Sequence, residues 1–94
     1  MSNLSSIEKQ DLRHAVLYAF ARRPETNMTP IQVKQSLIRL LPFSIDTADV
    51  TAAIQFHVDK AHLKELLDVW GSETTYRITA DGSLAHERDN SKIA

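Results

Sequence analysis

The sequence predicts an α+β fold of the winged-helix class, with three helices, a β-hairpin wing and a short closing helix. Two segments of the first half show helical periodicity, and a third helical segment spans residues 46–61. Two β-prone stretches follow at 63–70 and 76–79, separated by a turn-forming segment that contains a glycine. A helical pair that leads into a hairpin is the outline of a winged helix with a helix-turn-helix.

The length and composition suit one small domain. The chain has 94 residues, of which 43% are hydrophobic and 24% charged, so a packed core is expected rather than disorder. We expect a single winged-helix domain over residues 1–94, with an ordered core of about 5–88 and a frayed polar tail at 89–94.

The first helix has clear start and stop signals. Ser5 and Glu8 have the spacing of a capping box, and Pro24 ends the helix. Arg22 and Arg23 fall in the expected last turn, where they either complement the helix dipole or contact phosphate. The expected buried stripe is Leu12, Ala15, Val16, Ala19 and Phe20.

A polar connector at residues 25–28 leads into the second helix. Thr29 is the expected N-cap, Pro30 occupies the first helical position, and Gln32 the capping-box position. Pro42 is expected to end this helix after about three turns. Its expected inner face consists of Val33, Leu37, Leu40 and Leu41.

The third helix is the candidate recognition element. Asp46 or Thr47 is its expected cap. Helical spacing turns one face inward, formed by Val50, Ala53, Ile54, His57, Val58 and Ala61. It turns another set outward: Ala48, Thr51, Ala52, Gln55 and Asp59, flanked by Asp49 and Phe56. Phe56 either packs under the hairpin or forms part of a protein contact.

The hairpin and the segment after it complete the expected core. Trp70, the last apolar residue before the turn, is expected to be buried between the hairpin and the helices. Residues 80–88 are expected to form a short helix with Thr79 as a possible cap, although Gly82 disfavours a helix.

Few patterns in the sequence suggest catalysis or metal binding. The chain has no cysteine and only two glycines, which excludes a thiolate site and a glycine-rich phosphate loop. His57, Asp59 and His62 are neighbours in sequence, but His57 is expected to point inward and Asp59 away from it. A core or boundary histidine that tolerates replacement by leucine is therefore the preferred interpretation. We expect no enzyme activity, no metal and no cofactor.

The charge is unevenly distributed, although the net charge is only −1. Residues 1–43 carry six basic and three acidic side chains, and residues 44–94 carry five basic and nine acidic ones. An anionic partner should therefore prefer the N-terminal half. The third helix carries Asp46, Asp49 and Asp59 against Lys60 alone, so its charge opposes DNA binding.

The chain shows no targeting or membrane signal. No apolar run approaches the ~18–20 residues of a membrane span, and the first ten residues lack the regions of a signal peptide. A cytoplasmic location without membrane contact is expected.

The order of motifs is similar to that of a known group. The matching residues are Asp11-Leu12-Arg13, Leu67-Asp68-Val69-Trp70, and Thr79 with Gly82. They resemble the small regulator-like winged-helix proteins of Mu-like phages and prophages over about residues 10–88. Ala61-His62 departs from that pattern, which has Gly followed by an apolar residue, and the group's basic, proline-containing tail is absent.

The resemblance implies a DNA-binding, transcription-regulator-like protein of phage or prophage origin. Double-stranded DNA is the expected partner, and a protein partner or a homodimer is also possible. The alternative is a winged-helix protein-interaction module without significant DNA affinity. The candidate DNA-binding residues are Arg22, Arg23, Lys34, Arg39, Thr51, Gln55 and Arg77.

Overall fold

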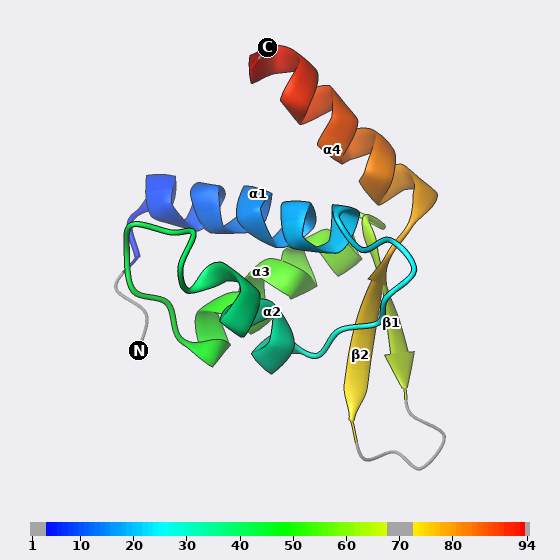
Figure 1. Ribbon diagram of the computed structural model, residues 1–94, viewed down its shortest axis with the longest axis horizontal. Helices are drawn as coiled ribbons and strands as arrows, with labels where there is room; N and C mark the ends of the chain where they lie inside the picture. Colours follow the sequence, from blue (N-terminus) through cyan, green and yellow to red (C-terminus); the bar gives the residue numbers. More distant parts are fainter. Residues whose placement is uncertain (1–3, 68–72, 94) are drawn as a thin grey trace.

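The chain forms three helices, a two-stranded hairpin and a fourth helix, in the predicted order. A computed structural model describes residues 4–67 and 73–93, with side chains described up to 88. The elements are α1 (Ser6–Ala21), α2 (Pro30–Leu37), α3 (Thr47–Asp59), β1 (Leu63–Leu67), β2 (Thr74–Ile78) and α4 (Ala80–Ile93) (Figure 1). None of the helices in the described part is long and apolar enough to cross a membrane.

Reciprocal capping boxes begin the first three helices. Ser5 pairs with Glu8 at α1, and Thr29 pairs with Gln32 at α2, as predicted. At α3, Asp46 is the cap and its partner is Asp49. In each box, two side chains satisfy two backbone N–H groups that the helix leaves without partners.

The core lies where α1, α2 and α3 meet. Phe20, Val16, Val33, Leu37, Val50 and Ile54 have no exposed surface. Leu17 is also buried, although the predicted stripe omitted it, while Ala15 is only half-buried. Apart from Ala15, the predicted inner face of α1 is therefore confirmed, and it is wider than predicted.

The second helix is shorter than predicted. It ends at Leu37 instead of reaching Pro42, because the backbone tightens into a turn in which Leu40 N donates to Leu37 O at 2.9 Å. This turn leaves Leu40 56% exposed, so its predicted place on the inner face is wrong. Leu41, Phe43 and Ile45 still pack against the core.

The hairpin is antiparallel and gains a third short partner. Leu63 pairs with Ile78 at one end, and Leu67 pairs with Thr74 at the other. Met28 exchanges two backbone hydrogen bonds with Tyr76, at 2.9 and 3.0 Å. Met28 is buried, so the prediction of a wholly polar connector is wrong there. Trp70 lies outside the described residues.

The fourth helix begins at the predicted cap and extends beyond the predicted end. Gly82 N donates to Thr79 Oγ1 at 3.0 Å, which places Thr79 in the capping role. The helix continues past Arg88 to Ile93. It packs against α1, where the rings of Tyr18 and His86 lie 5.8 Å apart, and its far end rises away from the rest of the molecule (Figure 1).

Candidate nucleic-acid interface

The outer face of α3 is open, as the helical spacing predicts. Each member of the predicted outward set is exposed: Ala48, Thr51, Ala52, Gln55 and Asp59. Thr51 Oγ1 donates to Thr47 O at 2.9 Å, and Gln55 Nε2 donates to Asp59 Oδ1 at 2.9 Å. The side chains of Ala48 and Ala52 are short and apolar, so the polar groups of Thr51 and Gln55 are the main hydrogen-bonding features of this surface.

The acidic residues of α3 do not all lie on this face. Asp49 is only 9% exposed, and its Oδ2 accepts a hydrogen bond from Asp46 N at 3.0 Å. Asp46 Oδ1 accepts in turn from Asp49 N at 2.8 Å. Both carboxylates therefore lie at the positive end of the helix dipole. The prediction that Asp49 flanks the exposed face is wrong, and Asp59 is the carboxylate that remains there.

Three of the predicted DNA-binding residues gather at the connector between α1 and α2. Arg22 and Arg23 follow the last turn of α1 rather than lying in it, because the helix ends at Ala21. The guanidinium of Arg22 lies 5.6 Å from the centre of the Tyr18 ring. Arg77 Nε donates to Pro24 O at 3.2 Å, which ties β2 to the same connector.

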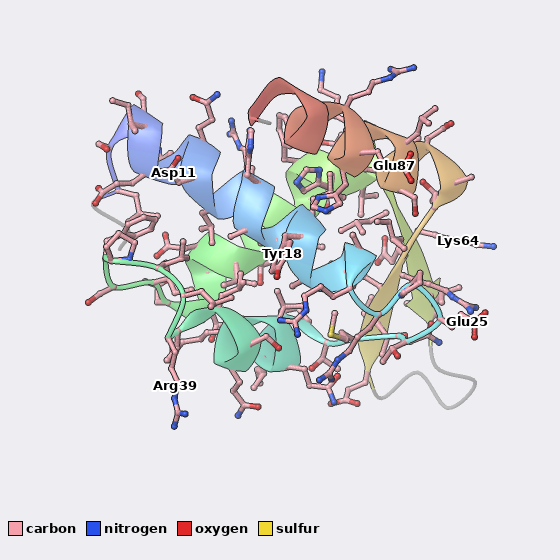
Figure 2. All side chains as sticks on the ribbon, turned by 45° about the horizontal axis from the view of Figure 1, so that its top comes forward. Asp11, Tyr18, Glu25, Arg39, Lys64 and Glu87 are labelled. Atoms are coloured by element: carbon pink, nitrogen blue, oxygen red, sulfur yellow. The ribbon has the colours of Figure 1, made fainter. Side chains whose placement is uncertain are left out.

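The other two predicted cations lie elsewhere. Lys34 is half-buried and lines a surface hollow with Ile38, Phe43 and Ile45. Arg39 is exposed beyond the end of α2, on the opposite side of the view from Glu25 of the connector (Figure 2). The five predicted cations therefore belong to separate surface regions.

Other cations lie beside α3, and the candidate set omitted them. The guanidinium carbon of Arg13 lies 4.2 Å from the centre of the Phe56 ring. Lys60 Nζ lies 5.7 Å from the same ring. Phe56 thus packs against a side chain of α1. The sequence shows the Lys9–Arg13 spacing on one face of α1, but it does not show which helix that face meets.

His57 is a buried histidine with two partners, as the preferred interpretation expected. Its Nε2 lies 2.7 Å from Arg13 O, and its Nδ1 lies 3.0 Å from His62 Nδ1. Because a carbonyl only accepts, Nε2 carries the proton and Nδ1 of the neutral ring accepts from His62. Burial lowers the pKa of His57, although the hydrogen bond to Arg13 acts in the opposite direction.

Known structures share this arrangement of helices and hairpin. A PadR-like transcriptional regulator from Bacillus cereus superposes with a TM-score of 0.74 at 14% identity, over 94% of this chain and 85% of that chain. A transcriptional regulator from Clostridium thermocellum superposes with a TM-score of 0.73 at 13% identity, over 95% and 86%. The chain has a winged-helix fold. No protein-family model and no curated protein sequence matches it.

Within the winged-helix fold, α2 and α3 are the helix-turn-helix and the β1–β2 hairpin is the wing. The adhesin competence repressor from Streptococcus pyogenes has the same fold, with a TM-score of 0.68 at 16% identity over 96% of this chain. The chain spans 60% of that repressor. In helix-turn-helix proteins that bind DNA, the second helix of the pair lies in the major groove, and α3 is the second helix of the pair in this chain.

Proposed function

We propose that this winged-helix protein binds double-stranded DNA as a transcription-regulator-like protein, with α3 in the major groove. One observation carries the proposal: the exposed face of α3 presents one carboxylate, that of Asp59, because Asp46 and Asp49 are engaged in the capping box. The main electrostatic argument against DNA, three carboxylates on this helix, is thereby weakened. The names of the structural neighbours, which are transcriptional regulators, agree with this proposal.

The side chains of α3 suit a reading role. A helix with its side chains is about 10–12 Å wide and the major groove is about 12 Å wide, so the low surface of Ala48 and Ala52 allows close approach. Gln55 suits a bidentate contact to adenine, which requires its amide to give up the hydrogen bond to Asp59. Thr51 suits a contact to a base or to a phosphate. Arg22, Arg23, Lys34, Arg39 and Arg77 are the proposed phosphate contacts.

The finer parts of the proposal rest on the sequence. Phage or prophage origin is supported by the motif similarity over residues 10–88. A cytoplasmic, non-enzymatic role follows from the same similarity.

The test is a fluorescence anisotropy titration of a random-sequence duplex at low salt. Asp59→Asn should tighten non-specific binding severalfold, because it removes the carboxylate that faces the phosphates. Asp81→Asn is the matched control: the same chemical change at an exposed position in the first turn of α4, outside the proposed contacts, should leave DNA affinity unchanged. Absence of measurable binding by the wild type and by Asp59→Asn would overturn the proposal in favour of a protein-interaction module.

A second measurement distinguishes recognition of the base sequence from sequence-independent attraction to DNA. Gln55→Ala should keep the affinity for random DNA and lose preference for a sequence selected from a random duplex pool by the wild type. Equal loss on both duplexes would show that Gln55 does not read bases.

A further inference from the structure

A basic ledge runs along the α1 side of α3. It consists of Lys9, Arg13 and Lys60, with the ring of Phe56 between the last two. Arg13 and Lys60 lie 4.2 and 5.7 Å from the centre of that ring, within the range of cation–π attraction. Lys9 lies one turn before Arg13 on α1, so both side chains leave the helix on one side.

The ledge adjoins the open face of α3. Lys9 and Arg13 line a surface hollow together with Ala48 and Ala52 of that face. Asp49 also lines the hollow, but it is buried and one of its oxygens is held by the cap. Asp11 leaves α1 on the side opposite to Lys9 and Arg13, as helical geometry requires.

The position of the ledge is held by the core. His57 Nε2 donates to the carbonyl of Arg13 at 2.7 Å, which fixes α1 against α3 at this point. The rings of Phe56 and His57 meet edge to face at 5.3 Å. The cations of the ledge therefore come from α1 and from the C-cap of α3, two segments that are held together by a buried contact.

We infer that the basic ledge binds the phosphates of one DNA strand along the rim of the major groove that α3 occupies. The inference rests on the proposed function. Since a helix nearly fills the groove, groups that flank it lie against the phosphates of the groove edge, and cations there supply sequence-independent affinity. Lys9 stands beside the N-terminal half of the exposed face, whereas Arg13 and Lys60 stand beside its C-terminal half.

Phe56 has a positioning role in this scheme. Its ring limits the conformations of Arg13 and Lys60 before DNA arrives, so less side-chain freedom is lost on binding. Phe56→Leu keeps an apolar side chain but removes the attraction between ring and cation. It should weaken DNA binding while leaving the salt dependence unchanged, because every charge is still present.

The experiment measures affinity for a random duplex as a function of salt. Arg13→Gln and Lys60→Gln should each lower the slope of log affinity against log salt by about 0.9. For the double variant, raising salt from roughly 50 to 200 mM should weaken binding about tenfold less than it weakens the wild type. Arg88→Gln, which removes one positive charge from α4, is the matched control and should keep the wild-type slope. Melting temperatures establish that each variant is folded.

The outcomes distinguish this inference from the function on which it rests. If the wild type binds DNA but the ledge variants keep its slope, the inference is wrong and the proposed function stands. If neither the wild type nor Asp59→Asn binds DNA, both are wrong. A lower slope in Arg88→Gln equal to that in Arg13→Gln would also overturn the inference, because it would reflect net charge alone.

Discussion

The two ends of α3 are built in different ways. The N-terminal end is local: Asp46 and Asp49, three residues apart, satisfy each other's backbone N–H groups. The C-terminal end combines a local turn with a contact from a distant segment. Ala61 has a φ of 62°, His62 N donates to His57 O at 2.8 Å, and Thr79 Oγ1 lies 2.6 Å from Ala61 O.

The difference shows where the fold tolerates an unfavourable residue. A left-handed backbone favours glycine, yet this chain has alanine there. Contacts from Thr79, from Gly82 and from the His57–Arg13 pair surround this end. The N-terminal end of α3 depends on two side chains that are close together in the sequence, whereas the C-terminal end depends on three other parts of the chain.

The largest effect on stability is expected at Gly82, against which the segment after the C-terminal end of α3 packs. A Cβ at this position would overlap the carbonyl oxygen of His62 and lie 2.8 Å from Ile78 Cγ1. Because backbone atoms cannot move aside cheaply, Gly82→Ala should lower the free energy of unfolding by about 3 kcal/mol. Urea denaturation measures this loss. Arg88→Ala, at an exposed position of the same helix, should change stability by less than about 0.5 kcal/mol.

The second effect concerns His57, and here the structure reverses the expectation from the sequence. The sequence alone predicts that His57→Leu is tolerated, but the ring bonds both Arg13 O and His62. Its loss should cost about 1–3 kcal/mol, because His62 loses its buried partner and the Arg13 carbonyl loses a donor. In a double-mutant cycle, His62→Leu should cost less in the His57→Leu background than in the wild type. Additive costs would argue against the pair.

The pH dependence of stability tests the same histidine. The pKa of His57 is lowered by burial in the folded state, so the unfolded chain binds more protons below the ordinary pKa of about 6.5. The contribution of His57 is therefore complete above about pH 6.5 and is lost as the pH falls towards its folded-state pKa. Denaturation at a series of pH values should show this loss in the wild type and a weaker one in His57→Leu.

A smaller effect on stability is expected at the N-terminal end of α3. Asp46→Ala should cost about 1 kcal/mol, because Asp49 N loses its acceptor at the helix start. Thr47→Ala is the control, since the sequence left either residue as the cap. If Thr47→Ala proved the more damaging change in thermal denaturation, the assignment of Asp46 as the cap would be wrong.

The smallest effect should be a gain. Ala61→Gly should raise the free energy of unfolding by about 0.5–1 kcal/mol, because glycine adopts a positive φ without strain. Ala52→Gly, the same change in the exposed middle of α3, should lower stability by a similar amount. The two opposite signs, measured by denaturation, separate backbone strain from general flexibility. A loss at both positions would show that Ala61 is not strained.

The features that depend on nearby residues could be predicted from the sequence. The starts of α1 and α2 were predictable because a capping box closes within three residues. Most of the inward face of α3 was predictable because helical spacing places residues on a face without reference to the rest of the chain. The prediction that Ala61 belongs to this face is wrong: the helix ends at Asp59, and Ala61 is exposed. The hairpin followed from two β-prone stretches and the turn between them.

The features that join distant residues depend on how the helices and the hairpin pack together. The burial of Met28 depends on its pairing with Tyr76, and the basic ledge depends on how α1 lies across α3. Asp49 could be counted as a charge in the sequence, but its burial follows from the packing of α3 against α1. Local spacing determines which residues share a face of one helix, whereas the packing of the core determines what that face meets.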